Sequence, residues 1–242
     1  MRKSLISLVA LSMAATAAPA FAQDEEAGDG FTVSGEATVV SDYRFRGVSL
    51  SNEDPAIQGS ITVSHDSGLY AGVWGSSLDG EAGFGGTEID LFAGFSTQLT
   101  EGLSADIGAT YYVYPNAEPS FTNFGQDDFD YLEFYGSLGT TLGPVEASVG
   151  AAYTPDGQEA ILEGLYLWAD AGVGIPNTPI SLTGHVGRQA FEGPEDNEYF
   201  DWSLGASVSY DALTFGVAYV DTDLGDFQNV DAGVVFSLSA GF

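Results

Sequence analysis

Residues 103–114 read LSADIGATYYVY, and the alternation in this stretch decides the fold. Apolar side chains occupy every second position, whereas Asp106 falls on the opposite parity. Successive side chains of a β-strand point to opposite faces of the sheet, so a period of two predicts a strand with one apolar and one polar face. An amphipathic helix would instead place apolar residues every three or four positions.

The same period recurs in twelve blocks, separated by clusters of Gly, Pro, Asn and Asp. The predicted strands are 31–46, 56–64, 69–76, 87–97, 103–114, 131–140, 145–154, 165–173, 180–186, 202–208, 215–219 and 234–242. Their connections alternate between short turns, such as HDSG at 65–68, and long loops, the longest at 115–129. Twelve antiparallel strands with both chain ends on the short-turn side give this alternation.

The two parities also differ in charge. The parity opposite the apolar residues carries acids in most of the predicted strands, namely Glu36, Asp42, Glu88, Asp90, Asp106, Glu133, Glu146, Asp170, Asp201 and Asp231. On the apolar parity, charges occur only at strand ends beside long loops. A basic residue in the middle of a bilayer costs roughly 2–4 kcal/mol and an acidic one less, so an uncharged band suits a face turned to lipid.

We therefore expect an all-β fold, a transmembrane antiparallel up-and-down β-barrel of about 12 strands with short periplasmic turns and long extracellular loops. A soluble β-sandwich is the alternative, since it would also separate the parities but would turn the apolar face inward. Aromatic residues gather toward the strand ends of the apolar parity, while Ala, Val, Leu and Gly occupy the middle. Such girdles are typical of a membrane barrel.

The composition excludes several classes of function. The 242 residues include 35 acidic and 5 basic residues and no cysteine, and the formal net charge is −30 at pH 7. Disulfide scaffolds and cysteine-ligated metals are therefore impossible. So strong a negative charge would repel phosphate backbones, which excludes nucleic acid as a partner. A hydrophobic content of 44% is too high for a disordered chain.

The amino terminus predicts export. Arg2 and Lys3 precede an apolar run at 5–18 and the small-residue site Ala20-Phe21-Ala22, the pattern of a cleaved signal peptide at residues 1–22. A membrane anchor is the alternative, but the run is short for a span. Residues 23–30 form an acidic leader, and residues 31–242 are predicted to form a single barrel domain. The expected location is the outer membrane of a Gram-negative bacterium.

The last nine residues, VVFSLSAGF at 234–242, alternate in polarity and end on Phe242. In outer-membrane proteins a strand with a terminal aromatic residue is the signal recognised by the barrel-assembly machinery, which we expect as a partner through Phe242. Outer-membrane lipid and lipopolysaccharide are the other expected partners. An ordinary edge strand is the alternative interpretation.

Three segments carry a resemblance to a known family. SDYRFRGVSLS at 41–51, DPAIQGSITV at 54–63 and SGLYAGVWGSSLD at 67–79 closely resemble the opening of the TorF-like family of proteobacterial porins. The likeness extends over the mature chain in length and strand layout, but the distinctive motifs lie in its first third. It implies an outer-membrane porin and transfers no functional residue.

The lumen is the predicted functional site. If Asp42, Arg44 and Arg46 continue the inward parity of the first strand, two guanidinium groups lie among carboxylates, and their opposed charges form a constriction. Asp90 and Asp231 are the candidate partners across the lumen. A structural ion pair that closes the first strand against its neighbour near the loops is the alternative. We expect passive diffusion of small hydrophilic solutes with a preference for cations, unless the acidity is a property of the whole proteome. The pore-lining candidates are Asp42, Arg44, Arg46, Glu88, Asp90, Asp106, Glu133, Glu146, Asp170 and Asp201.

Other functions have weaker signals. A non-conducting barrel whose acidic loops bind a surface partner is the second hypothesis. Trp74, Tyr166 and Trp168 point inward and are expected to fill the bore. Neither His65 nor His185 lies in a nucleophile motif, so no catalytic residue is predicted, and a barrel enzyme that depends on His185 is a third hypothesis. The acidic loops match no calcium loop, so we expect no metal or cofactor, and loop 115–129 is the candidate for an inward plug.

Overall fold

The computed structural model describes residues 25–27, 30–80, 84–115, 117, 129–158, 162–192, 198–225 and 228–242. The predicted signal peptide at 1–22 and half of the acidic leader, residues 23, 24, 28 and 29, lie outside these residues. Within the described part, no helix is long and apolar enough to cross a lipid bilayer.

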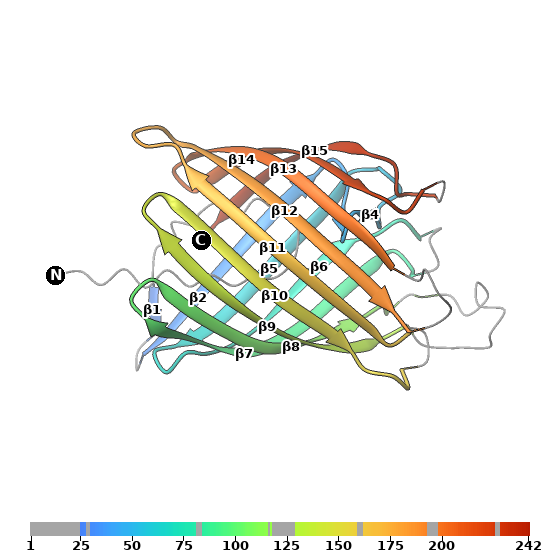
Figure 1. Cartoon of the computed structure of the whole chain (residues 1–242), viewed down its shortest axis with the longest axis horizontal. Coiled ribbons are helices and arrows are strands. Elements are labelled where there is room, and N and C mark those ends of the chain that lie inside the picture. The colour runs from blue at the N-terminus through green and yellow to red at the C-terminus, as the bar shows by residue number, and fades with distance from the viewer. Residues whose placement is uncertain are drawn as a thin grey trace.

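Twelve antiparallel strands close into a barrel (Figure 1). They are β2 (Phe31–Val40), β5 (Ala56–His65), β6 (Leu69–Ser77), β7 (Thr87–Thr100), β8 (Leu103–Val113), β9 (Tyr131–Leu142), β10 (Val145–Thr154), β11 (Gly164–Gly174), β12 (Ile180–Phe191), β13 (Glu198–Tyr210), β14 (Leu213–Thr222) and β15 (Gly233–Gly241). Neighbours in the chain are neighbours in the sheet, and β2 pairs with both β5 and β15. The ring has no open edge, as a bilayer requires, and the predicted fold class is confirmed.

Three short strands lie outside this ring. β1 (Glu25–Ala27) pairs with Phe31 to Val33 of β2, on the part of that strand beyond the reach of β15. β3 (Arg44–Phe45) and β4 (Val48–Ser49) pair only with each other and form a small hairpin. We call residues 41–51 the lumenal hairpin, because they lie inside the barrel.

The connections alternate as the sequence predicts. Short turns and the C-terminus lie toward one end of the barrel, and long connections lie at the other (Figure 1). Gly68, Gly102 and Gly143 occupy three of the short turns with φ of 95°, 79° and 66°. A side chain rarely adopts this left-handed conformation, so glycine lets these strands reverse within few residues.

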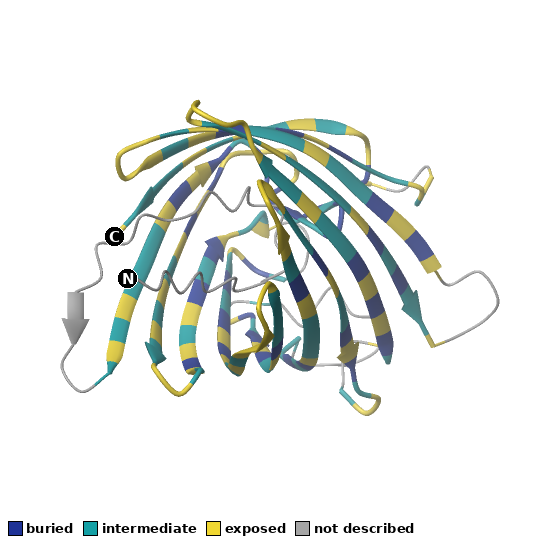
Figure 2. Ribbon diagram, turned by 60° about the vertical axis from the view of Figure 1, so that its left-hand side comes forward, coloured by how far each residue is buried: buried dark blue, intermediate teal, exposed yellow. Residues whose placement is uncertain are grey.

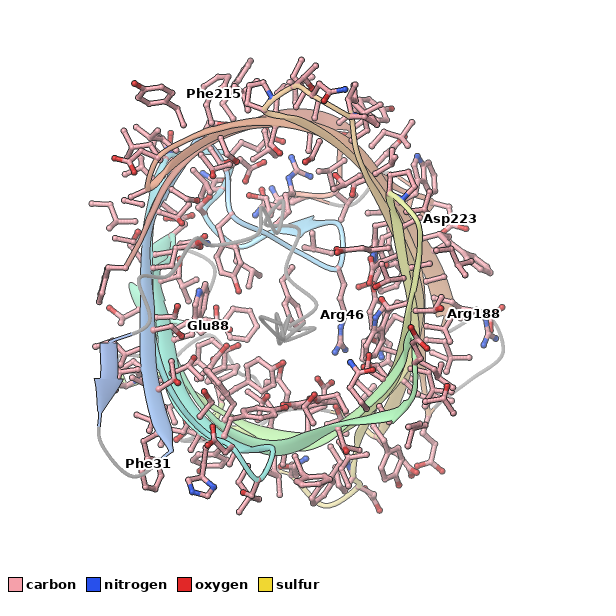
Figure 3. The ribbon with its side chains drawn as sticks, turned by 90° about the vertical axis from the view of Figure 1, so that its left-hand side faces the viewer. Phe31, Arg46, Glu88, Arg188, Phe215 and Asp223 are labelled. Atoms are coloured by element: carbon pink, nitrogen blue, oxygen red, sulfur yellow. The ribbon has the colours of Figure 1, made fainter. Side chains whose placement is uncertain are left out.

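The apolar parity points outward. Ile57 and Leu204 are 70% and 69% exposed, whereas Glu88 and Asp201 on the other parity are 1% and 3% exposed. Exposed and buried residues therefore alternate along the strands in Figure 2, and Figure 3 places Phe215 outside the wall and Glu88 inside it. A sandwich would bury the apolar parity, so that alternative is wrong.

Inside the barrel, aromatic rings lie over glycines of neighbouring strands. A Cβ added to Gly150 would be 2.2 Å from the ring of Trp168, and one added to Gly94 would be 2.3 Å from the hydroxyl of Tyr70. The missing side chains make room for large rings in a narrow interior. Trp168 is buried, as predicted, and so are Trp74 and Tyr166.

The expectation of a first strand at 31–46 is wrong at its end, because β2 stops at Val40. Ser41 still bonds to Phe236 of β15 through its backbone N–H, at 2.8 Å, and the chain then turns into the lumen. Arg46 and Gly47 follow each other with φ of 49° and 84°, which makes the tight reversal between β3 and β4. Arg44 and Arg46 therefore lie on the hairpin and not on the barrel wall.

Candidate functional site

The lumenal hairpin spans the interior near the end with the long connections. Tyr43 packs against Trp74 of β6, with ring centres 5.5 Å apart, and Phe45 packs against Tyr112 of β8 at 6.0 Å. At the hairpin tip, Gly47 lies against side chains of β13 and β14, since an added Cβ would be 2.2 Å from a methyl carbon of Thr222 on β14. The hairpin thus contacts distant parts of the wall, and it constricts the lumen (Figure 3).

Asp42 organises the hairpin from within. Its carboxylate accepts hydrogen bonds from Arg44 Nε at 2.5 Å, from Ser49 Oγ at 2.5 Å and from Ser51 Oγ at 3.3 Å. Arg44 also donates to the backbone oxygen of Asp231, at 2.9 Å. The predicted contact with Asp231 therefore exists, but through its carbonyl group. The Asp42–Arg44 ion pair lies within the hairpin itself.

Arg46 reaches from the hairpin tip to the opposite wall. Its Nη1 donates to Gln189 Oε1 of β12 at 2.6 Å, and its Nη2 donates to the two carboxylate oxygens of Glu133 on β9 at 2.8 and 2.7 Å. The guanidinium carbon lies 4.2 Å from the ring centre of Tyr166 and 4.7 Å from that of Phe45. Such a setting combines an ion pair with cation–π contacts. The predicted partner Asp90 is not the one that Arg46 binds.

Further hydrogen bonds surround this ion pair. Tyr112 and Thr154 each donate a hydroxyl hydrogen bond to Glu133, both at 3.2 Å. Burial lowers the pKa of Arg46, but the charge of Glu133 more than offsets it and leaves that pKa above its usual value. Arg46 therefore remains charged, and its positive charge is bound by a carboxylate of the protein itself.

Other lumenal carboxylates have no basic partner among the described residues. Glu88 of β7 accepts one hydrogen bond from the Tyr114 hydroxyl at 3.1 Å, and its Oε2 has none. Asp90 Oδ1 on the same strand also has no hydrogen bond. Asp106 of β8 accepts from the Tyr70 hydroxyl at 2.7 Å, and its Oδ2 is unbonded. Each of the three acids therefore keeps one carboxylate oxygen without a hydrogen bond from the described residues.

His185 of β12 lies between two carboxylates. Its Nδ1 is 2.6 Å from Asp170 of β11 and its Nε2 is 3.0 Å from Asp201 of β13. The Tyr166 hydroxyl is 2.8 Å from the same Nε2. The partners of the His185 ring among the described residues are thus two carboxylates and a phenol.

The predicted site residues all lie on the lumenal parity or on the lumenal hairpin. Six of them form three groups: Asp42 with Arg44, Arg46 with Glu133, and Asp170 with Asp201 around His185. Glu88, Asp90 and Asp106 belong to none of these groups. Glu146 is a half-buried residue of β10, apart from these pairs. Gln189 was missed, because the ninth predicted strand ended at 186 and β12 continues to Phe191.

Two further predictions concern loops and metals. Most of the predicted plug, residues 116 and 118–128, lies outside the described residues, so this expectation stays a prediction. Among the residues with described positions, no group of three or more His, Asp or Glu side chains is arranged to hold a metal ion.

Comparisons with known proteins agree on the fold. Residues 24–239 match the model of a family described as "Bacterial protein of unknown function (Gcw_chp)". No curated protein matches the chain in sequence. In structure the chain is similar to the NanC porin, with a TM-score of 0.56 and 9% identity over 87% of this chain and 98% of the other. It is equally similar to the KdgM porin, with a TM-score of 0.56 and 6% identity over 86% of this chain and 98% of the other. At such identities the likeness concerns the fold alone.

Proposed function

The chain belongs to the Gcw_chp family of bacterial proteins of unknown function, and we propose that it is an outer-membrane channel for passive diffusion of small hydrophilic solutes, with a preference for cations. The resemblance of residues 41–51, 54–63 and 67–79 to TorF-like porins supports this proposal, and so does the porin fold. The proposal assigns no catalytic step to the barrel.

One observation carries the cation preference. Each described lumenal base is paired with a carboxylate: Arg44 with Asp42, Arg46 with Glu133, and His185 with Asp170 and Asp201. Glu88, Asp90 and Asp106 are not paired with a base. A lumen with surplus carboxylates raises the local concentration of cations and disfavours anions. A KdgM porin structure holds disordered oligogalacturonate, an acidic solute, and we expect this chain to disfavour such anions.

The proposed setting includes export, assembly and lipid contact. We propose that residues 1–22 are removed on export and that Phe242 is read by the barrel-assembly machinery. In the folded barrel the backbone of Phe242 exchanges two hydrogen bonds with Gly35, at 2.8 and 2.9 Å, so this residue also helps to close the ring. The exposed apolar face would contact acyl chains, and the long acidic connections would meet lipopolysaccharide through divalent cations.

Reversal potentials test the proposal. The mature protein is refolded in detergent, its folded state is checked by heat-modifiable mobility on gels, and it is inserted into planar bilayers in a KCl gradient. We expect stable conductance and a reversal potential with the sign of cation selectivity. Anion selectivity, or no conductance from folded protein, would contradict the proposal.

A non-conducting barrel that binds a surface partner is the second candidate, and the lumenal hairpin is the observation that favours it. Replacing residues 41–51 by a short glycine turn separates the two cases. A channel should conduct before the replacement and conduct more after it, whereas a plugged barrel should conduct only afterwards. Deletion of loop 115–129 then shows whether this loop affects permeability or adhesion to a partner.

A further inference from the structure

Two carboxylates in the wall of the lumen are buried, and no basic group of the described residues is bonded to them. Glu88 and Asp90 are alternate residues of β7, and they are 1% and 3% exposed. Their side chains point to the same face, since residues two apart in a strand do so. Each keeps one oxygen to which no described residue donates a hydrogen bond, Oε2 of Glu88 and Oδ1 of Asp90. Figure 3 shows Glu88 on the inner side of the wall.

The lumenal hairpin adds a third polar group at this place. The Tyr43 hydroxyl has no hydrogen bond of normal geometry, although its residue is only 2% exposed. It lies close enough to Glu88 and Asp90 that burial and their charges raise the pKa of Tyr43 well above its usual value. The hydroxyl therefore keeps its proton and lies beside the two carboxylates as a neutral group.

This arrangement lacks positive charge. Buried ions are normally paired with an opposite charge or bound to a metal. Removing an ion from water without such a partner costs roughly several kcal/mol. The nearby guanidinium of Arg46 is bound to Glu133. Unbonded buried oxygens in a folded protein call for a specific explanation, and an ion is one such explanation.

We propose that Glu88, Asp90 and the Tyr43 hydroxyl form a site for a divalent cation of the Ca²⁺ type. Two carboxylates match a charge of two, and all three groups offer oxygen, the ligand that such hard cations prefer. With only two carboxylates, the remaining ligands would be water or backbone oxygens, so the ion should bind weakly and exchange. Sites of this strength have dissociation constants on the order of 10⁻⁴–10⁻³ M.

The site would also connect the hairpin to the wall. Tyr43 belongs to the hairpin, whereas Glu88 and Asp90 belong to β7, so a shared ion would hold the two together. This consequence rests on the proposed channel, because an ion held there would narrow the constriction and reduce its negative charge. Binding itself does not depend on conduction.

Terbium luminescence tests the site in the folded barrel in detergent. Tb³⁺ replaces Ca²⁺ at oxygen sites and emits when a nearby tryptophan is excited. Trp74 is the cross-strand partner of Asp90 on β6, so it is placed to sensitise an ion bound there. We expect saturable emission that Ca²⁺ displaces at about 10⁻⁴–10⁻³ M. The double variant Glu88→Gln, Asp90→Asn should weaken binding at least tenfold, and Tyr43→Phe should weaken it several-fold.

A matched control is Asp106→Asn. Asp106 is also a buried lumenal acid with one unbonded oxygen. On β8 the residue opposite Asp90 is Tyr112, and Asp106 lies six positions from it, a distance of about 20 Å along the strand. This variant should bind like the wild type. Trp74→Phe should abolish the emission, while Ca²⁺ should still stabilise this variant against unfolding, as it should the wild type. This second measurement keeps the test valid if the double variant fails to fold.

The outcomes separate this inference from the proposed function. Absence of sensitised emission, or equal emission from the double variant, overturns the site and means that the carboxylates are neutralised by protons. A barrel that binds Tb³⁺ but does not conduct keeps the site and loses the channel. A barrel that conducts but does not bind Tb³⁺ keeps the channel and loses the site.

Discussion

Arg46 donates Nη2 to both carboxylate oxygens of Glu133, at 2.8 and 2.7 Å, although 87 positions separate the two residues in the chain. The ion pair joins the tip of the lumenal hairpin to β9 on the barrel wall. Both side chains are buried, so solvent screens this pair less than it screens an exposed one. The contact is therefore well placed to hold the hairpin in position.

Glu133→Gln should release the hairpin. The substitution keeps the size of the side chain and removes its charge, which leaves Arg46 buried without a counter-charge. Removing one partner of a buried ion pair destabilises by about 3–5 kcal/mol. We expect a higher mean conductance and more open-channel noise in bilayer recordings, and faster proteolysis within residues 41–51.

Glu198→Gln is the control for this substitution. Glu198 pairs with Arg188, and both side chains are partly exposed, 46% and 37%. Figure 3 places Arg188 outside the barrel. Exposed pairs contribute about 0–1 kcal/mol, so conductance should stay unchanged. The same effect from both substitutions would contradict the role of the Arg46–Glu133 pair.

Gly47→Ala should displace the hairpin tip by a different route. The residue has a φ of 84°, and a Cβ there would be 2.2 Å from a methyl carbon of Thr222. A side chain is therefore both strained and obstructed, and destabilisation by more than about 1 kcal/mol is expected. Conductance noise should rise as in Glu133→Gln. Gly80→Ala is the control, because nothing lies within 4 Å of its added Cβ. If the conductance noise of Gly80→Ala is as high as that of Gly47→Ala, displacement of the hairpin tip is not the cause.

The lumenal parity was predictable because the period of two is a local property. Glu88, Asp90, Asp106 and Glu133 all lie on the inner face, as the alternation within each strand predicts. Strand pairing needs little more information, since short turns join neighbours and an even number of strands closes the ring. The fold class was accordingly predicted in full.

The constriction was predicted only in part. Arg44 and Arg46 were expected on the wall, because alternation continues through residues 41–46 although β2 ends at Val40. Asn-Gly or Asp-Gly would have indicated a tight hairpin, but Arg46-Gly47 is no such signal. Contacts across the lumen, such as Arg46 with Gln189, depend on the three-dimensional position of the hairpin, and alternation carries no information about it.

Gly150→Ala should destabilise the barrel. Gly150 of β10 pairs with Trp168 of β11, and an added Cβ would be 2.2 Å from the indole ring. Overpacking of this kind costs typically about 1–3 kcal/mol. We expect a lower urea midpoint for unfolding in lipid vesicles. Gly172→Ala tests the neighbouring strand, where the nearest atom is 3.9 Å away; if it destabilises as much as Gly150→Ala, the ring-over-glycine explanation fails.

Cation preference should weaken with salt, and two half-buried acids should account for part of it. The screening length is about 10 Å at 0.1 M and about 3 Å at 1 M, so the permeability ratio of K⁺ to Cl⁻ should fall severalfold between these concentrations.

Glu36 and Glu146 are lumenal, half-buried residues near the short-turn end. Their double replacement by Gln should lower the ratio at 0.1 M and change little at 1 M, whereas Asp223→Asn, outside the wall in Figure 3, should leave it unchanged. If the permeability ratio changes neither with salt nor with these substitutions, pore size and not lumenal charge selects the solute.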